Sequence, residues 1–497
     1  MNDGSLIVLS ADRTLMAGYN LLFDGMLAAS QTTTAPMALM GPLLLPRNRG
    51  NAPLGLRRVE AALVAGGFSR QDIRVCTQED LPRAIGRNTR IIGLSAGEPG
   101  GGGMNSSTMS AVAGGRIWPQ AAFGKLAKRV RNLRQQAHPA VKVVLGGAGA
   151  WQVAQDESLQ RQLGIDHVVG GYVEDEIARL FRQWIDGQDG PRAQKTACPT
   201  AQRIPPILGP TTMGAVELSR GCGLGCSFCT IGQTTMSHLS AEAVEQDVRT
   251  NIAGGQQNIS LLSEDLFRYG GPLKQANPPA LIALLKRLRQ IPSLRLLQVD
   301  HANLFSVAQF SDDELRQVRA LLGRDGQKYV WLNIGVETPS GELLRRLGGG
   351  AKMGDCPPAQ WGDFCHAQLS RLCQAGFLPF VSLLLCCPGQ TPQHTAAMRE
   401  WVRRFDGMPI TFFPMLLAPI GGGETSPGRD DLTALDWQLI RESYRFNFRW
   451  LPRMIWDNQR FGGEQLWKRL VLQAMGQGQM ALWQTLFAWR KWRADSC

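Results

Sequence analysis

The sequence lacks an apolar run long enough to cross a lipid bilayer. Its longest runs, such as FVSLLLCC at 380–387, fall far short of the roughly 20 residues that a membrane-spanning helix needs. The first ten residues, MNDGSLIVLS, also lack the basic segment of a secretory signal peptide and are expected to begin a buried strand. We therefore expect a cytoplasmic protein without a transmembrane segment.

A clustered basic surface and a disulfide framework are missing too. The formal net charge of the 497-residue chain is +12, but its lysines and arginines are scattered, so we predict no nucleic-acid partner. The 11 cysteines are odd in number, and in a chain of this size their spacing does not suggest paired disulfides. This pattern favours a reducing compartment.

Residues 1–186 alternate short apolar runs with helical patterns, and the loops after the later runs are rich in glycine. Strands that alternate with helices predict an α/β domain with a parallel, doubly wound sheet of the Rossmann or flavodoxin type. Such sheets bind ligands in the loops at the carboxyl ends of their strands. The expected strands are 5–11, 72–77, 90–97, 141–150 and 165–171.

Residues 187–212 are rich in proline, glycine and polar residues and are expected to form a linker. The alternation restarts at 213 and continues to 430, which predicts a partial (β/α)6 barrel, open on one side, with its site at the carboxyl ends of the strands. Residues 431–497 are expected to form a helical C-terminal region rich in tryptophan. The six expected barrel strands are 215–219, 258–263, 294–300, 329–337, 380–385 and 410–417.

Directly after the first of these strands, the segment ELSRGCGLGCSFCTIGQ places Cys222, Cys226 and Cys229 in a C-x₃-C-x₂-C pattern, with no fourth cysteine nearby. A structural zinc site closes with four ligands, so three thiols fit it poorly. An iron–sulfur cluster accepts thiolates at such short spacing. With four irons and three thiolates, one iron stays open to a small-molecule ligand.

This pattern after the first strand of a partial barrel resembles the radical S-adenosylmethionine (SAM) superfamily. The resemblance implies a [4Fe-4S] cluster on the three cysteines, with SAM chelated to the open iron. Phe228 matches an aromatic residue that this family places near the adenine of SAM. The segments 261–270 and 333–350 resemble SAM-contacting segments, which implies that Glu264, Asp265 and Glu337 bind SAM. A helix cap or a hydrogen bond at the barrel rim is the other interpretation of each acid.

The segments VVLGGAGA and DHVVGGYVEDEI resemble the cobalamin-binding domains that precede some radical SAM barrels. One departure matters: cobalamin domains that ligate cobalt through the protein place a histidine in D-x-H-x-x-G after the first strand, but here ADRTLMAG has Thr14 at that place. The only histidines of the domain, His138 and His167, lie outside this loop, so we predict cobalamin with no histidine below the cobalt. The resemblance implies cobalamin contacts at Ser95, Gly146, Gly147, Gly170 and Gly171.

The leading hypothesis is a cobalamin-dependent radical SAM methyltransferase that methylates an unactivated carbon through a 5′-deoxyadenosyl radical and methylcobalamin. The resemblance implies a small-molecule or peptide substrate and an electron donor of the reductase or flavodoxin type. Two alternatives stay open: a radical cyclase or rearrangement enzyme that transfers no methyl group, and a non-catalytic cobalamin sensor or carrier with a vestigial cluster loop.

The remaining cysteines bear on two further possibilities. Methylthiotransferases of the superfamily need three cysteines in the first domain for a second cluster, and only Cys76 precedes the linker here, which argues against that branch. A second cluster elsewhere would have to use thiols whose spacing matches no tight ligand loop, so buried or incidental thiols are the preferred interpretation. These thiols belong to Cys356, Cys365, Cys373, Cys386 and Cys387.

Overall fold

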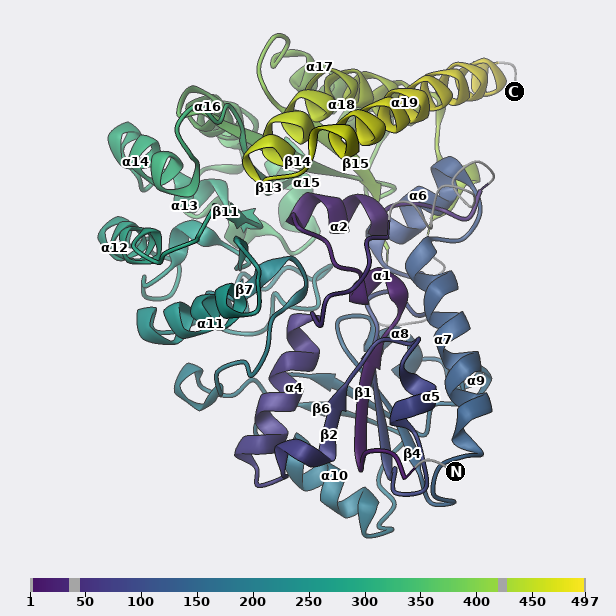
Figure 1. Ribbon diagram of the computed structural model, residues 1–497. Coiled ribbons are helices and arrows are strands. Elements are labelled where there is room, and N and C mark those ends of the chain that lie inside the picture. The colour runs from purple at the N-terminus through teal and green to yellow at the C-terminus, as the bar shows by residue number, and fades with distance from the viewer. Residues whose placement is uncertain (1–2, 35–44, 419–426, 496–497) are drawn as a thin grey trace. The chain divides into compact units, whose positions relative to one another are not determined.

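The computed structural model describes residues 3–34, 45–418 and 427–495, with side chains as far as residue 487 (Figure 1). The chain forms two compact units. The first comprises Met1–Val216 and Leu239–Gln256, and the second comprises Glu217–His238 and Gln257–Cys497.

The first unit is built on a six-stranded sheet with the order β2-β1-β3-β4-β5-β6, in which all neighbouring strands are parallel. This order is the flavodoxin-like doubly wound arrangement, with its switch point between β1 and β3. The predicted α/β class is therefore confirmed. The strands are β1 Ile7–Ala11, β2 Ile73–Val75, β3 Ile91–Ser95, β4 Lys142–Gly146, β5 His167–Gly171 and β6 Ala193–Thr196.

Apolar side chains cover both faces of this sheet, because successive residues of each strand point to opposite sides. Ile7 and Leu9 of β1 pack with Phe181 of α10 in one core, whereas Val8 packs with Phe123 of α7 in the other. The helices are α1 Arg13–Met16, α2 Leu22–Ala29, α4 Leu54–Ala65, α5 Leu81–Ala84, α6 Met104–Ala113, α7 Trp118–Arg134, α8 Ala150–Ala154, α9 Glu157–Leu163, α10 Ile177–Ile185 and α11 Ala241–Ala253.

The segment 187–212, expected to be a linker, contains regular structure. Its residues 193–196 form β6, which extends the sheet beside β5. Further on, the backbone N–H of Ile207 donates to Asp247 of α11 at 3.0 Å, and that of Thr211 donates to Asn251 at 2.8 Å. Proline and glycine indicate irregular backbone, but composition does not reveal these pairings. The predicted domain boundaries stay a prediction.

The strands of an open barrel form two consecutive sheets, with the orders β11-β10-β7 and β12-β13-β14-β15; all of them belong to the second unit except the first two residues of β7. Only Asp300 separates β11 from β12, so the six expected strand positions follow one another in chain order, as predicted. A short antiparallel pair, β8 and β9, flanks the cysteine loop. The strands are β7 Ala215–Glu217, β8 Ser219–Arg220, β9 Ser237–His238, β10 Asn258–Leu262, β11 Leu296–Val299, β12 His301–Ala302, β13 Val330–Glu337, β14 Phe377–Leu385 and β15 Thr411–Leu416.

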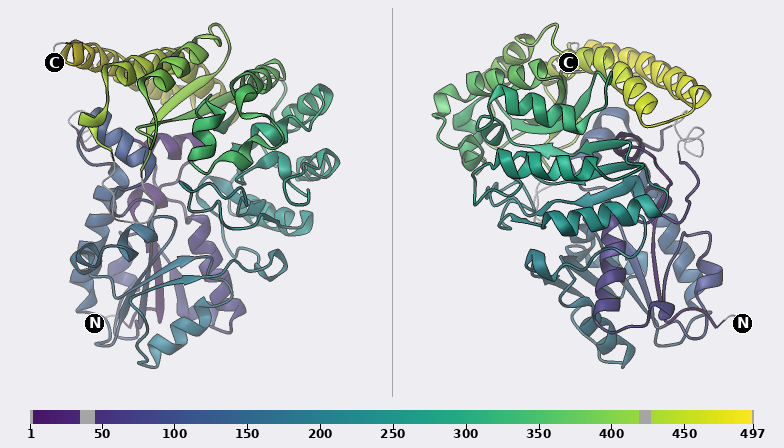
Figure 2. Two further views of the ribbon diagram at one scale, coloured as in Figure 1. Left: turned by 180° about the vertical axis from the view of Figure 1, so that it is seen from behind. Right: turned by 60° about the vertical axis from the view of Figure 1, so that its left-hand side comes forward.

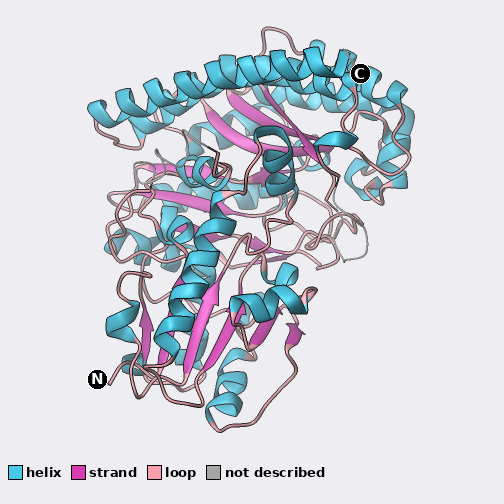
Figure 3. Ribbon diagram, turned by 90° about the vertical axis from the view of Figure 1, so that its right-hand side faces the viewer, coloured by secondary structure: helices cyan, strands magenta, loops and turns pink. Residues whose placement is uncertain are grey.

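Helices line the outside of these strands, seen as a teal-to-green series in Figure 2. The expected helical C-terminal region is present as two long helices, α18 and α19 (Figure 3). Asn447 of α18 bonds both to the N–H and to the carbonyl of Phe412 in β15, at 2.9 and 2.8 Å, which fixes α18 against the last strand. The helices are α12 Pro278–Arg289, α13 Leu304–Val307, α14 Asp312–Leu322, α15 Gly341–Arg346, α16 Trp361–Gln374, α17 Pro392–Arg403, α18 Ala434–Phe461 and α19 Leu466–Asp495.

The two C-terminal helices, α18 and α19, are long enough to raise the question of whether they could span a membrane. None of the helices in the described residues combines the length and apolar character that crossing a bilayer requires.

Candidate active site

The three cysteines of the C-x₃-C-x₂-C pattern lie in the loop between β8 and β9, at the carboxyl end of the first barrel strand. Glycine bends this loop. Gly221 has φ +71°, and a Cβ there would lie 2.5 Å from the carbonyl oxygen of Thr234. The N–H of Cys222 donates to that same oxygen at 2.9 Å. The backbone thus closes the base of the loop at a distance that only glycine permits.

The thiols are held close to protein atoms. Cys226 is 4% exposed, whereas Cys222 and Cys229 are partly exposed. Burial raises the pKa of Cys222 to about 11 and also raises the pKa of Cys226. The free thiols of Cys222 and Cys226 are therefore neutral near pH 7, and a bound metal would supply the positive charge that holds them as thiolates.

The described residues do not form the ligand arrangement of a single metal ion. Within the described part of the chain, no three His, Cys, Asp or Glu side chains come together closely enough to hold one ion. A four-iron cluster differs because each thiolate binds a different iron atom. The ligands of such a cluster therefore need not meet at one point, as the ligands of a single ion do.

Side chains from the barrel fix the loop between β8 and β9 in place; we call it the cluster loop, because it carries the three cysteines. Ser227 donates from its hydroxyl to the carbonyl of Leu347 at 2.7 Å, which ties the middle of the loop to the end of α15. Arg268, itself 3% exposed, donates to the carbonyl of Cys222 at 2.8 Å. Phe228 lies in the same loop and is partly exposed.

The two acids after β10 have different surroundings. Asp265 is fully buried, and its carboxylate accepts hydrogen bonds from the N–H of Asn303 at 3.2 Å and from the hydroxyl of Ser306 at 2.5 Å. Burial raises the pKa of Asp265 to about 6, although these bonds oppose the shift. Asp265 thus holds the start of α13, which agrees with the capping interpretation.

Glu264 forms no hydrogen bond with any residue that the structure describes, although it is largely enclosed. Burial raises the pKa of Glu264, while the charges of His301 and Lys352 oppose that shift. Of the two acids, Glu264 is the one whose carboxylate remains available to a ligand.

Glu337 ends β13 in an unusual backbone conformation. Its φ is +66°, in the left-handed region that favours glycine, and it lies at an irregularity in the pairing of β13 with β14. Strain of this kind in a non-glycine residue concentrates at functional sites. The carboxylate is 8% exposed and forms an ion pair with Lys352, which also donates to the carbonyl of Gly335 at 3.0 Å.

Lys352 is the central cation of the barrel interior. Burial would lower its pKa, but the Glu337 carboxylate and, more weakly, Cys226 and Cys222 raise it above the usual value. Lys352 also affects the titration of Glu264 and His301. One charged side chain therefore connects the cluster loop with the acids at the ends of β10 and β13.

Asp300, between β11 and β12, and His301, the first residue of β12, complete this array. Nδ1 of His301 lies 2.9 Å from a carboxylate oxygen of Asp300, and Asn333 donates to the same oxygen at 3.1 Å. Burial would lower the pKa of His301, but Asp300 and Glu264 raise it to about 9. Burial would raise the pKa of Asp300, yet His301 and Asn333 lower it.

Sequence reasoning named Glu264 and Glu337 but missed Lys352, Asp300 and His301. Two signals could have identified them. Asp300 and His301 directly follow the third barrel strand, where a barrel places its functional residues. Lys352 follows a run of three glycines after the fourth strand.

In the first unit, the predicted cobalamin contacts lie at the carboxyl ends of neighbouring strands. Ser95 ends β3 and pairs with Gly146, which ends β4. Gly147 follows with φ +94°, and a Cβ there would lie 2.6 Å from the Ser95 hydroxyl. The structure thus brings these three residues together at one edge of the sheet, with space for backbone but not for a side chain at 147.

Gly170 and Gly171 end β5 at the same edge. Gly171 has φ +89°, and a Cβ there would lie 2.4 Å from the carbonyl oxygen of Thr196 in β6. This glycine is therefore required by the packing of β5 against β6. A Cβ at Gly170 would meet nothing closer than 4.0 Å, so that position is open to a ligand.

The loop after β1 contains the departure at Thr14. The hydroxyl of Thr14 donates to Asp12 at 2.5 Å, and Asp12 caps α1. The second carboxylate oxygen of Asp12 and the hydroxyl of Tyr19 are buried without a partner among the described residues. Burial raises the pKa of Asp12 to about 6. Unpartnered buried polar atoms beside this edge suit a polar ligand there.

The two histidines of the first domain, His138 and His167, lie at the amino ends of the strands, away from the predicted cobalamin contacts. His167 begins β5, stacks on Trp184 with ring centroids 4.4 Å apart, and faces the carbonyl of Pro191 at 3.2 Å. His138 precedes β4, and its Nδ1 accepts from the N–H of Ala140. Neither histidine lies in the loop after β1, as the sequence predicts.

Comparison with known proteins gives sequence relatives that match part of the chain. No protein-family model matches it. The ribosomal protein uS12 methylthiotransferase RimO of Desulfotalea psychrophila is 22% identical over 286 residues, covering 56% of the chain and 55% of the relative. RimO of Nitratidesulfovibrio vulgaris strain DP4 is 33% identical over 201 residues, covering 39% of the chain and 43% of the relative. The chain thus spans about half the length of the curated relatives it matches.

Solved structures match more of the chain. The radical SAM methyltransferase TsrM from Kitasatospora setae, with tryptophan substrate and the SAM analog aza-SAM bound, has a TM-score of 0.54 at 15% identity and covers 84% of this chain and 75% of its own. The same enzyme with cobalamin and a [4Fe-4S] cluster bound has a TM-score of 0.54 at 16% identity, covering 82% and 75%. At this identity the likeness concerns the fold. The chain therefore shares the fold of TsrM, and this agrees with the two-part α/β architecture that its sequence predicts.

Proposed function

We propose that the protein is a cobalamin-dependent radical SAM methyltransferase that methylates an unactivated carbon. The single observation that carries the proposal is the glycine-bent loop of three cysteines beside a buried array of acids and one lysine. When bound, the cluster and SAM would supply a 5′-deoxyadenosyl radical, and cobalamin would supply the methyl group. The protein's own contribution is to hold and orient these groups.

In the second unit, Cys222, Cys226 and Cys229 would hold the cluster. The Glu264 carboxylate, which has no hydrogen-bond partner among the described residues, would accept from the amino group of SAM. The Lys352 ammonium would face the carboxylate of SAM, because these two groups carry opposite charges. Phe228 and Glu337 are further proposed contacts to SAM, whereas Asp265 supports the site by holding α13.

In the first unit, the carboxyl edge of the sheet would hold cobalamin. Ser95, Gly146, Gly147, Gly170 and Gly171 end neighbouring strands there. Thr14 lies in the one-turn helix α1 directly after β1, so no histidine is available at this position to ligate cobalt.

The proposed substrate is a small molecule or a peptide side chain, and the proposed electron donor is a reductase or a flavodoxin-type protein. Tryptophan is the first substrate to test, because it is the substrate bound in the TsrM structure. Action in the cytoplasm, without a nucleic-acid partner, completes the proposal.

Anaerobic reconstitution with iron and sulfide tests the cluster. We expect a broad absorbance near about 400 nm from an iron–sulfur chromophore. Cys226→Ala should abolish this absorbance, whereas Cys373→Ala should keep it, because Cys373 lies on α16 outside the loop. Equal loss in both variants would refute the assignment of the cluster to this loop.

Transfer of label from SAM with a labelled methyl group tests the reaction. The reconstituted enzyme, given cobalamin, a reductant and tryptophan or a peptide library, should place the label on carbon in a product. Label found only in methionine, together with 5′-deoxyadenosine, would favour the cyclase or rearrangement alternative. A methylthio product would instead favour the activity named for RimO, the sequence relative.

A further inference from the structure

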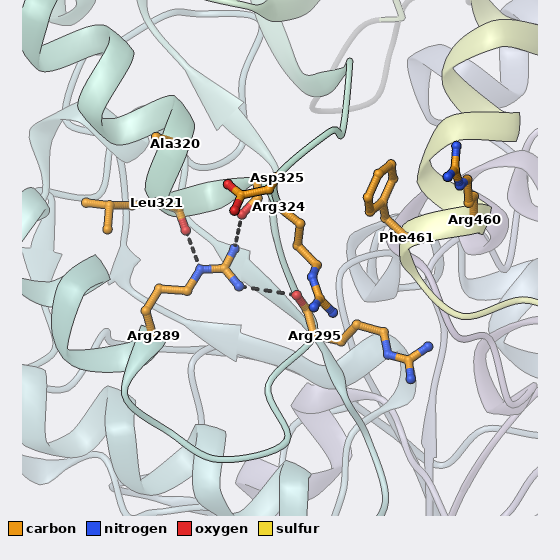
Figure 4. A pocket seen from close by; sticks show the side chains of 9 residues that line it. Arg289, Arg295, Ala320, Leu321, Arg324, Asp325, Arg460 and Phe461 are labelled. Atoms are coloured by element: carbon orange, nitrogen blue, oxygen red, sulfur yellow. Dashed lines mark hydrogen bonds between the residues drawn. The ribbon is translucent and has the colours of Figure 1, made fainter.

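A cavity lies in the second unit, at the opposite ends of the barrel strands from the loop of the three cysteines. It has a volume of about 520 Å³ and is lined by residues that precede β11 and β13 and by the end of α18 (Figure 4). Four arginines and only one acid, Asp325, line it. The arginines are Arg289, Arg295, Arg324 and Arg460.

Arg289 forms a fixed wall of this cavity. Its guanidinium donates to the carbonyls of Leu322 and Gly323 at 2.6 and 2.8 Å, and to the carbonyl of Arg295 at 3.2 Å. It thereby binds carbonyls at the end of α14, which have no partner within the helix. Burial lowers the pKa of Arg289 to about 10, and the nearby charge of Arg324 adds to this effect.

The other three arginines are not used in this way. The guanidinium groups of Arg295, Arg324 and Arg460 form no hydrogen bond or ion pair with any residue that the structure describes; Arg460 only lies over the ring of Phe461, at 5.5 Å. Exposed arginines elsewhere in the unit do find carboxylates, as Arg316 does with Asp313 at 2.5 Å. Like charges gathered around one cavity repel each other unless an anion joins them.

We propose that this cavity binds the phosphoryl or diphosphoryl group of a small molecule. A guanidinium donates two parallel hydrogen bonds to phosphate oxygens. The three guanidinium groups without a protein partner therefore suit a ligand with several negative charges. The volume lies within the range of about 300–1,000 Å³ that small-molecule sites occupy. The ring of Phe461 offers an apolar surface to the rest of the ligand. This site does not depend on the proposed methyltransferase activity.

Isothermal titration calorimetry of the reconstituted protein with inorganic pyrophosphate tests the site. The same titration is repeated with inorganic phosphate and with a nucleoside diphosphate. We expect saturable binding of one pyrophosphate. Arg295→Gln and Arg324→Gln should each weaken it about ten- to hundredfold, the effect of losing charge-assisted hydrogen bonds. Tighter binding of the nucleoside diphosphate would identify an organic diphosphate as the ligand, and equal binding would identify the free anion.

Arg316→Gln is the matched control, because Arg316 lies on α14 but does not line the cavity. It should bind pyrophosphate as the unaltered protein does. Absence of saturable binding, or equal weakening by Arg316→Gln and Arg324→Gln, would overturn the proposal. Circular dichroism of each variant checks that the fold is kept, and Arg324→Lys separates charge from the forked geometry, because lysine keeps only the charge.

Discussion

The ion pair between Lys352 and Glu337 offers the sharpest test of the barrel interior. The side chains of the two residues are 14% and 8% exposed, so each charge depends on the other for compensation. Removing one partner of a buried pair leaves an uncompensated charge and costs about 3–5 kcal/mol. We therefore expect Lys352→Met and Glu337→Gln each to lower the free energy of unfolding by about 3 kcal/mol.

The double variant should lose much less than the sum of the two, because neither charge is then left alone. We expect a coupling energy of about 2–3 kcal/mol from the double-mutant cycle. Urea unfolding of the reduced protein without cofactors, followed by tryptophan fluorescence, measures each free energy. The same cycle on the exposed pair Arg316–Asp313, whose side chains are 59% and 91% exposed, should give less than about 1 kcal/mol. A coupling energy no larger than that of this control would refute the arrangement of charges described for the site.

Three further predictions concern the two sites. Gly221→Ala should lower the iron content after reconstitution far more than Gly225→Ala, because both have positive φ but only at 221 would a Cβ meet Thr234; equal loss would refute the steric argument. Glu264→Gln should weaken SAM binding at least about tenfold, measured by equilibrium dialysis, with little change in stability. Asp265→Asn should instead mainly lower the melting temperature, because the Asp265 carboxylate accepts hydrogen bonds from Asn303 and Ser306. The pKa of Asp12 is raised from 3.8 to about 6, so the folded protein holds this proton more tightly than the unfolded chain. Its contribution to stability should therefore be present below about pH 4 and lost between about pH 4 and pH 6, by about 3 kcal/mol, and Asp12→Asn should flatten this part of a denaturation-against-pH profile.

Local signals predicted the framework of the molecule. The apolar runs predicted the strands of the two units except β6 and the short β8 and β9, because the side chains of a buried strand are apolar along consecutive residues. The cysteine spacing likewise identified its loop, since its thiols lie within eight residues of one another in the chain. The strand β6 could not be predicted in this way, because AQKT is polar and becomes a strand only by pairing with β5.

The roles of individual acids depended on distant residues. Glu264 and Asp265 are neighbours in the sequence, but Asp265 is occupied by Asn303 and Ser306, which lie 38 and 41 positions away. Lys352 acquires its role only when its loop returns to Glu337 and the cluster loop. Such contacts are set by closure of the barrel, and no local pattern records them.

The left-handed backbone of Glu337 sets a limit on how stable this protein can be. A non-glycine residue in that conformation costs about 1–3 kcal/mol, which glycine at the same position would not incur. Glycine at 337 would remove this cost, but it would also remove the carboxylate that compensates Lys352, and that loss destabilises the fold by about 3 kcal/mol. The strained backbone and the ion pair therefore act on stability in opposite directions at this one residue, so relieving the strain should not make the protein more stable.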